Sequence, residues 1–181
     1  TQNFVMPYIH RYDSTASDEN FVYFGKYGLL DGDTTYSSTD RGYDMMIARW
    51  PVRDLSELAT IEDKVRSYEA SVNFGPWRST VTLVADDEFG NYDTESFHVR
   101  YTEELEKYHL PAAFARNKIY LWDYPFGSTG GKPAVNKAII KSINDGTLLV
   151  NFTCHGNPDT WAHEHVFNRN TDLSQLNNTD K

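Results

Sequence analysis

The sequence predicts an α/β protein built around a mostly parallel sheet. Short runs of apolar and β-branched residues alternate with longer segments in which apolar residues recur every three or four positions, the periods of strands and helices. Strands and helices that alternate in this way form parallel sheets with right-handed crossovers. The last strand, Leu-Leu-Val-Asn-Phe-Thr over residues 148–153, begins with a continuous apolar run, so we expect it to be buried on both faces.

Length and composition indicate one globular domain. The chain has 181 residues, of which 39% are hydrophobic and 14% aromatic, enough for one ordinary core. The net charge of -9 and the scattered basic residues argue against nucleic acid and anionic membranes as partners. No apolar run approaches the roughly 20 residues that a transmembrane helix needs. We therefore expect a single α/β domain over residues 1–181, with an irregular N-terminal segment over residues 1–41.

The first fifty residues are predicted to contain short strands. Met6–Ile9 has the pattern of an edge strand. Apolar residues on both sides of Gly25-Lys26, over residues 21–24 and 27–30, indicate a hairpin. Residues 43–50 are then expected to form a longer strand that ends at the following proline.

A helix is predicted to begin after Asp54. The Asp54 carboxylate suits the N-cap position, and Glu57, three residues later, is placed to complete a capping box. Its apolar residues form one stripe, which consists of Leu55, Leu58, Ile61, Val65 and Tyr68.

Two further strand–helix units follow. The first joins a strand over residues 80–85 to a helix whose apolar stripe consists of Phe97, Tyr101, Leu105 and Tyr108. The second joins a strand over residues 118–122 to a helix that starts at Pro133 and ends at Gly146. The stripe of this second helix consists of Val135, Ala138, Ile139 and Ile143.

Polar residues that follow the strands are expected to meet at one edge of the sheet. The carboxyl ends of parallel strands share an edge, and ligands of open α/β sheets bind there. Asp86-Asp87, Asp123 and His155 follow three of the predicted strands. We therefore expect His155 to be a catalytic imidazole, oriented by Asp87, with Asp86 and Glu88 competing for that role.

The sequence contains no cofactor motif that meets its structural requirements. Residues 127–132, Gly-Ser-Thr-Gly-Gly-Lys, fail as a phosphate loop because Phe126 stands where the first Gly is needed and Pro133 replaces the Ser or Thr. Asp31 and Asp33 do not have the spacing of an EF-hand loop, so a solvated turn is favoured there. We expect no cofactor, with a structural calcium ion left open.

The remaining histidines and the single cysteine have ordinary explanations. His155, His163 and His165 with Glu164 match no common zinc-ligand spacing, and exposed loop histidines are favoured over a metal site. Cys154 and His155 are adjacent on a strand and should project to opposite faces, which disfavours a thiolate–imidazole dyad. We interpret Cys154 as a small packing residue.

Several motifs together resemble one family. Val-Asn-Phe-Thr-Cys-His-Gly over residues 150–156, followed by Trp-Ala-His-Glu over 161–164, is similar to the V-N-Y-T-G-H-G strand end of gingipain-type cysteine peptidases. Within this family it is most similar to the sortase-like peptidase of the type IX secretion system. Further matching segments lie at residues 47–52, 63–69, 84–88 and 135–139. The resemblance covers about residues 20–181.

The resemblance implies a caspase-like three-layer α/β fold and a set of site residues. It assigns the catalytic imidazole to His155 and an oxyanion-stabilising backbone N–H to Gly156. By position, the acidic partner is Asp87, with Glu88 as the alternative. Glu95 lies near the place of the family's substrate-pocket acid.

The chain departs from the family in two ways. Cys154 stands where the family has Gly, and no residue of this chain takes the place of the nucleophilic cysteine, which the family carries after the next strand. We therefore expect a sheet truncated before the nucleophile strand and a chain that is inactive alone. Thr1 and the lack of a signal-like segment agree with a processed product or an excised piece.

The resemblance thus predicts part of a cysteine endopeptidase. Its expected partners are protein substrates, the remainder of the peptidase domain and other secretion-system components. The substrates would be the C-terminal sorting signals of secreted proteins, at the surface or outer membrane of a bacterium. A non-catalytic scaffold with a degenerate peptidase fold is the alternative, and a metal-dependent hydrolase a more distant one.

Overall fold

The computed structural model describes residues 8–9, 16–18, 45–70, 74–87 and 97–179. The chain separates into two compact units, residues 1–66 and residues 67–181. The predicted hairpin at residues 21–30 and the turn around Asp31 lie outside the described residues, as do Glu88 and Glu95.

In the first unit, two short strands pair in antiparallel fashion. β1 (Tyr8–Ile9) and β2 (Ala16–Ser17) form a two-stranded ladder, so the strand predicted at residues 6–9 is present over its described part. Residues 45–50 are described but form no strand, so the predicted strand at 43–50 is wrong over that part. A strand needs a hydrogen-bonded neighbour, and this segment has none among the described residues.

The helix predicted after Asp54 is present as α1 (Leu55–Glu69). Asp54 Oδ1 accepts hydrogen bonds from the backbone N–H groups of Ser56 at 2.9 Å and Glu57 at 3.0 Å, which confirms the N-cap. A capping box would join the Glu57 carboxylate to the N–H of Asp54. The carboxylate instead accepts from the N–H of the preceding residue, Arg53, at 2.7 Å. None of the helix residues is buried among the described part of the chain, and Leu55 is 78% exposed.

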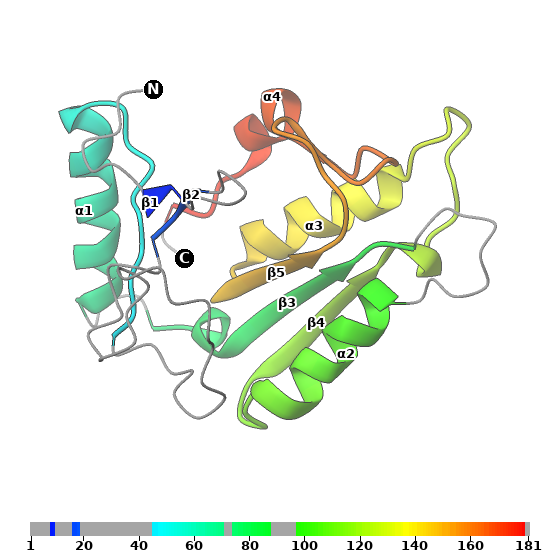
Figure 1. The fold of residues 1–181 in the computed structure, drawn as a ribbon, viewed down its shortest axis with the longest axis horizontal. Helices are drawn as coiled ribbons and strands as arrows, with labels where there is room; N and C mark the ends of the chain where they lie inside the picture. Colours follow the sequence, from blue (N-terminus) through cyan, green and yellow to red (C-terminus); the bar gives the residue numbers. More distant parts are fainter. Residues whose placement is uncertain (1–7, 10–15, 19–44, 71–73, 88–96, 180–181) are drawn as a thin grey trace. The chain divides into compact units, whose positions relative to one another are not determined.

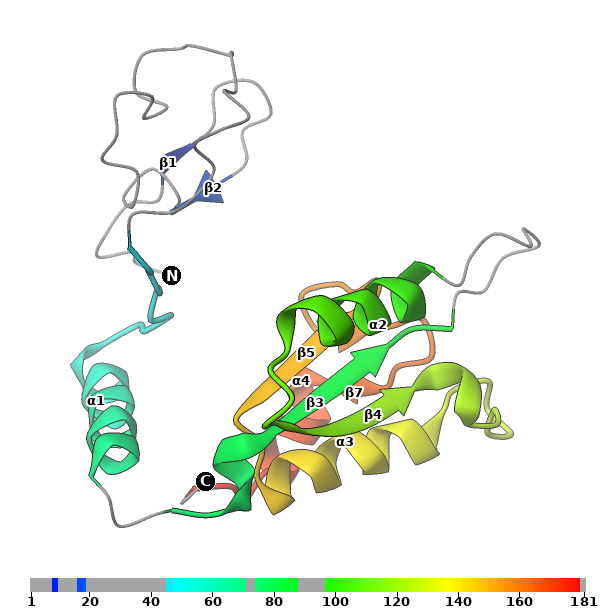
Figure 2. The ribbon, with the colours of Figure 1, turned by 90° about the horizontal axis from the view of Figure 1, so that it is seen from below.

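The second unit contains a parallel sheet of three strands. β3 (Thr80–Ala85) lies in the centre, between β4 (Ala115–Tyr120) and β5 (Leu149–Thr153), and both pairings are parallel (Figure 1). Helices α2 (Phe97–His109) and α3 (Pro133–Asp145) cover opposite faces of the sheet (Figure 2). These three layers confirm the predicted α/β fold with a parallel central sheet.

Shorter elements complete this unit. A 3₁₀ turn, η3 (Pro76–Ser79), precedes β3, and another, η4 (Leu121–Asp123), follows β4. After β5 the chain forms the antiparallel pair β6 (Thr160–Trp161) and β7 (Phe167–Asn168). The described part then closes with α4 (Arg169–Asp172) and η5 (Leu173–Gln175).

The core lies between the sheet and α3. Val135 and Ile139 of α3 are fully buried and pack in one cluster with Val84 and Ile119 of the sheet, so the predicted stripe of α3 is confirmed. Pro133 occupies the first turn of the helix. Gly146 ends it with a φ of 100°, a conformation that favours glycine, and its N–H bonds to the carbonyls at 142 and 143.

Two strand predictions need correction. β4 starts and ends earlier than the predicted strand at 118–122, because Leu121, which is fully buried, already belongs to η4. β5 is not buried on both faces as expected, since Leu149 is 56% exposed. The reason is that β5 forms one edge of the sheet among the described residues.

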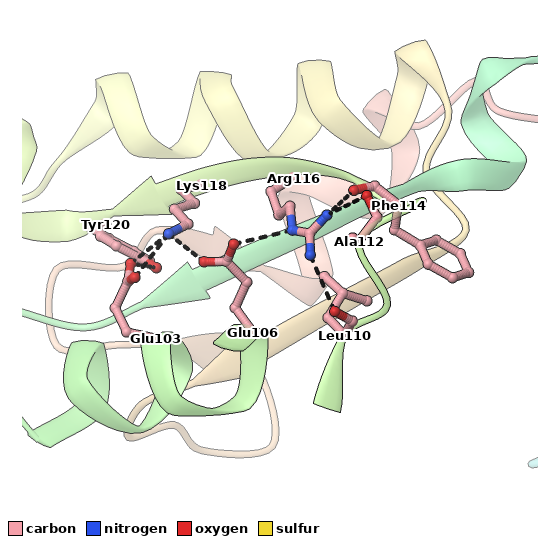
Figure 3. Close-up of polar contacts among 8 residues, drawn as sticks. All are labelled: Glu103, Glu106, Leu110, Ala112, Phe114, Arg116, Lys118 and Tyr120. Atoms are coloured by element: carbon pink, nitrogen blue, oxygen red, sulfur yellow. Dashed lines mark hydrogen bonds and ion pairs between the residues drawn. The ribbon is translucent and has the colours of Figure 1, made fainter. Parts of the chain in front are cut away.

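The predicted apolar face of α2 is also wrong. Tyr101, Leu105 and Tyr108 are exposed, and the buried residues of the helix are instead His98, Val99 and Thr102. The helix faces β4 through charged and polar contacts that apolar periodicity does not detect (Figure 3). These contacts join the helix carboxylates to the strand side chains Arg116, Lys118 and Tyr120.

The geometry of this polar layer is specific. Lys118 Nζ lies 2.7 Å from Glu103 and 2.5 Å from Glu106, and Arg116 Nε donates to Glu106 at 3.0 Å. The Tyr120 hydroxyl donates to Glu103 at 2.5 Å, and burial together with that carboxylate raises the pKa of Tyr120, so the hydroxyl keeps its proton. The layer fixes which side of α2 meets the sheet.

We predict that the core of the second unit depends on Leu121. Leu121→Ala removes a fully buried side chain and should lower the free energy of unfolding by about 2–5 kcal/mol. Leu173→Ala is the matched control, because Leu173 is 51% exposed. The control should cost less than about 1 kcal/mol in the same urea unfolding experiment. Equal costs for the two variants would contradict this description of the core.

Candidate active site

His155 lies at the carboxyl edge of the sheet. It follows β5 by two residues, and Asp86 and Asp87 follow β3, the parallel neighbour of β5. The imidazole is exposed, whereas Asp86 is only 3% exposed. The structure therefore places the predicted histidine and the predicted acidic residues at one edge, with the acids beneath the surface.

The His155 imidazole lies close to a second, buried imidazole. The His98 ring of α2 meets it edge to face, with centroids 5.2 Å apart and planes at 88°. One nitrogen of each ring and one Asp86 carboxylate oxygen all lie within 4.8 Å of one another. His163 is a further neighbour, with its ring centroid 5.7 Å from that of His155.

His98 was not predicted from the sequence. The sequence offers one weak signal, a second polar residue, Thr102, one helical turn later. In the structure the Thr102 hydroxyl donates to the His98 carbonyl oxygen at 2.8 Å. A polar pair at this spacing does not stand out beside an apparently apolar stripe on the same helix.

The loop after His155 leaves the Gly156 N–H unpaired with the strand segment opposite it. The N–H of Ala162 donates to the His155 carbonyl at 2.9 Å, and the N–H of Asn157 donates to the Thr160 carbonyl at 3.0 Å. Gly156 and Trp161 are thus the facing pair between two antiparallel hydrogen bonds. In such a pair the N–H and C=O of each residue point away from the partner. The Gly156 N–H is directed away from the Trp161 segment.

This loop is also tightly built. A side chain at position 156 would bring its Cβ to 3.3 Å from the Thr160 carbonyl oxygen. Ala162 adopts a φ of 56° and His165 a φ of 54°, which are uncommon for residues other than glycine. Such conformations cost free energy and persist only where the surrounding structure holds them in place. They are common in functional loops.

The thiol of Cys154 is poorly suited to nucleophilic attack. Burial, and then the nearby Asp86 carboxylate, raise the pKa of this thiol, whereas a reactive cysteine needs a lowered one. Its Sγ donates to the His155 carbonyl oxygen at 2.6 Å, and the side chain packs against the core cluster. Cys154 therefore has the environment of a packing residue.

Asp87 forms a buried ion pair with Lys132. The lysine is 2% exposed, and its ammonium also donates to the Leu121 carbonyl oxygen at 2.5 Å and lies 4.6 Å from the centre of the Phe126 ring. Lys132, the residue that the rejected phosphate loop would have used, is thus held by an internal ion pair. The predicted role of Asp87 beside His155 stays a prediction.

Glu164 adds a third carboxylate to this region. It is 5% exposed, and one oxygen each of Glu164, Asp86 and Asp87 lie within 4.8 Å of one another. Burial, and then the charges of Asp86 and Asp87, raise the pKa of Glu164. Its Oε2 has no hydrogen-bond partner among the described residues. Three carboxylates and the Lys132 ammonium therefore form a buried polar cluster beneath His155.

Taken together, three kinds of polar group meet at this edge of the sheet. They are an exposed imidazole, a backbone N–H that points away from the Trp161 segment, and a buried carboxylate. Groups of these kinds can serve as base, oxyanion donor and orienting acid in acyl transfer with a protein nucleophile.

Comparison with known families identifies the chain. Peptidase family C25 matches residues 1–181. The chain belongs to this family, the gingipain family of cysteine peptidases, which confirms the predicted resemblance and fold. No curated protein and no solved structure matches the chain. In the part of the chain that the structure describes, no helix is long and apolar enough to cross a membrane.

We predict that the Lys132–Asp87 pair is essential to the fold. Lys132→Met leaves the buried Asp87 carboxylate without its cation and should destabilise the chain by about 3–5 kcal/mol at neutral pH. Lys141→Met is the matched control, because the Lys141–Asp145 pair is exposed and should contribute less than about 1 kcal/mol. Denaturant unfolding measures both, and a small effect at Lys132 would contradict the buried pair.

We predict that Glu164→Gln stabilises the chain at neutral pH. Because the folded-state pKa of Glu164 is raised, its stabilising contribution is complete below its ordinary value of 4.5 and is lost as the pH rises through the folded-state pKa. Gln mimics the protonated form, so its melting temperature should exceed that of wild type near neutrality. The difference should disappear in acid.

Glu104→Gln, at an exposed position of α2, is the control for this measurement. It should leave the melting temperature unchanged across the same pH range. A Glu164→Gln variant that is less stable than wild type at neutral pH would show that the carboxylate is stabilised rather than strained where it lies.

Proposed function

We propose that this chain supplies the base side of a cysteine endopeptidase active site, with His155 as general base. The observation that carries the proposal is the exposed imidazole at the end of β5, backed by the buried Asp86 and His98. Membership of a cysteine peptidase family supports the same chemistry.

In this mechanism the imidazole accepts the proton of a cysteine thiol, and the thiolate attacks the scissile carbonyl carbon. The oxyanion that forms is stabilised by the N–H of Gly156, which points away from the Trp161 segment, and by the N–H of the nucleophile. The imidazolium then gives its proton to the leaving amine, and a water molecule or an amine resolves the acyl-enzyme.

The nucleophile of this proposal is a cysteine outside these 181 residues. Cys154 is the only cysteine in the sequence, and burial raises the pKa of its thiol. β5 forms one edge of the described sheet, and a parallel strand added there would end beside His155. Such a strand brings a thiol to the imidazole, which agrees with the expectation that this chain is inactive alone.

We assign the acidic partner of the imidazole to Asp86. Its carboxylate lies within 4.8 Å of His155, whereas the described contact of Asp87 is its ion pair with Lys132. A buried carboxylate near the imidazole favours the cationic form that arises during proton transfer. Glu88, the other candidate, and Glu95, proposed as a substrate-pocket acid, lie outside the described residues.

The substrate class is proposed from the sequence motifs. The strand end at residues 150–156 resembles that of the sortase-like branch, whose substrates are C-terminal sorting signals of secreted proteins. We propose this role for the present chain, at the surface or outer membrane of a bacterium and with other secretion-system components as partners. An acyl-enzyme suits such a role because an amine can replace water in the second step.

A non-catalytic scaffold is the second candidate. It is favoured by Cys154, whose side chain stands where the family has Gly beside the catalytic imidazole. The sequence that follows residue 181 in the gene distinguishes the two candidates. A cysteine at the end of an apolar strand supports the enzyme, and its absence supports the scaffold.

We predict that His155→Ala abolishes peptide cleavage in the polypeptide that carries the thiol. Removing a triad member costs about three or more orders of magnitude in kcat/KM. Because His155 is exposed, the variant should unfold at the same denaturant concentration as wild type. His109→Ala, an exposed histidine at the other end of α2, should retain full activity. Activity of His155→Ala within about tenfold of wild type would disprove the assigned role.

A further inference from the structure

We propose that Asp86, His98 and His155 form a binding site for a divalent transition-metal ion of the Zn²⁺ class, and that the bound ion switches the peptidase off. One ligand atom from each residue lies within 4.8 Å of the others. The three residues come from the ends of β3 and β5 and from the first turn of α2. The inhibitory consequence rests on the proposed function, whereas the metal site itself does not.

The donor set selects the class of ion. Two imidazole nitrogens and one carboxylate oxygen suit Zn²⁺ and its neighbours, and three protein ligands leave one position open. Calcium instead requires six to eight oxygen ligands, whereas this site offers a single carboxylate and two nitrogens. The site therefore discriminates against the ion that clustered carboxylates alone would suggest.

Two of the ligands are already held in place. The Asp86 carboxylate accepts a hydrogen bond from the N–H of Asp87 at 2.9 Å, and its own N–H donates to the Thr153 carbonyl at 3.2 Å. His98 is 7% exposed and packs edge to face against the third ligand. Partners that fix the ligand side chains in this way raise metal affinity, because the side chains lose less conformational entropy on binding.

The third ligand provides the adjustment and the entry path. Ligand atoms around a tetrahedral zinc, each about 2.0–2.1 Å from the ion, lie about 3.4 Å apart. The separations here are at most 4.8 Å, so each pair of ligand atoms must close by no more than about 1.4 Å, and the exposed His155 side chain has room to shift. An ion from solvent meets this imidazole first and the buried pair behind it.

The surrounding charge also favours a cation. Asp87 and Glu164 lie beside Asp86, and within this cluster Lys132 is the one cation among the described side chains. A second positive charge therefore relieves repulsion among the carboxylates instead of adding to it. The whole chain carries a net charge of -9, which adds a favourable long-range field.

Metal binding and catalysis compete for the same lone pair: a neutral imidazole has one basic nitrogen, and once that nitrogen binds the ion the other carries the hydrogen. A metal ion takes the lone pair with which the imidazole accepts the thiol proton, so the thiolate does not form. No covalent bond is made or broken, and a chelator that removes the ion restores the base. The site is thus a reversible inhibitory switch within the proposed active site.

The first experiment uses the wild-type chain and Zn²⁺ alone. Histidine side-chain NMR during a Zn²⁺ titration should show the His98 and His155 ring signals shifting together and saturating at one equivalent. The ring of His109, exposed at the far end of α2, should not shift with them. Saturation that moves His155 and His163 but leaves His98 unchanged, or no saturation at all, would overturn the proposal.

Variants measure the contribution of each ligand. Asp86→Asn, His98→Asn and His155→Asn should each weaken Co²⁺ or Zn²⁺ binding by about tenfold or more. His109→Asn and His163→Asn are the matched controls and should bind like wild type. Circular dichroism verifies that each variant is folded. Should a buried substitution unfold the chain, the exposed His155→Asn variant and the wild-type titration still decide the question.

Activity assays of the thiol-bearing enzyme separate the two proposals. If Zn²⁺ binds as described and inhibits reversibly, both stand. If it binds but His155→Ala remains active, the metal site stands and the proposed function fails. If His155 is essential but His98 takes no part in binding, the function stands and the metal site is wrong.

Discussion

The parallel pairing of β5 with β3 is the constraint on which the site depends. Ala85 and Thr153 are the last paired residues of the two strands, and the N–H of Asp86 continues the ladder to the Thr153 carbonyl at 3.2 Å. The Asp86 carboxylate therefore follows the end of β3 by one residue, and the His155 imidazole follows the end of β5 by two residues. A slip of one residue would exchange the faces on which Cys154 and His155 project, and the thiol would take the place of the proposed base.

In the proposed site, function and stability oppose each other directly beneath this edge. Burying three carboxylates with a single ammonium is costly, and the raised pKa of Glu164 is the sign that the cost remains in the folded state. An apolar layer would pack there without that penalty. It would not orient an imidazole or favour its cationic form, so the unfavourable charges make sense as part of the site rather than of the core.

Sequence reasoning succeeded where the determinants are local. Pro133, the apolar stripe of α3 and Gly146 define that helix within fifteen residues, and the apolar run before His155 defines β5. It failed where a distant partner decides the outcome. The segment at 45–50 has strand-like residues but no described neighbour to pair with. The exposed faces of β5 could not be foreseen either, because strand burial depends on which strands adjoin it.

The error on α2 explains why His98 was missed. Neighbouring helix positions are rotated by about 100°, so choosing Phe97 as the buried residue directs His98 away from the sheet. Which face of α2 meets the sheet is decided by Glu103 and Glu106. Their carboxylates contact side chains of β4, namely Arg116, Lys118 and Tyr120, and this turns the helix face that carries His98 toward the sheet (Figure 3). Those contacts join residues ten to seventeen positions apart, beyond the reach of a periodicity argument. The same contacts that hold α2 on β4 therefore hold His98 against His155, so the polar layer of the fold and the chemistry of its edge depend on one helix orientation.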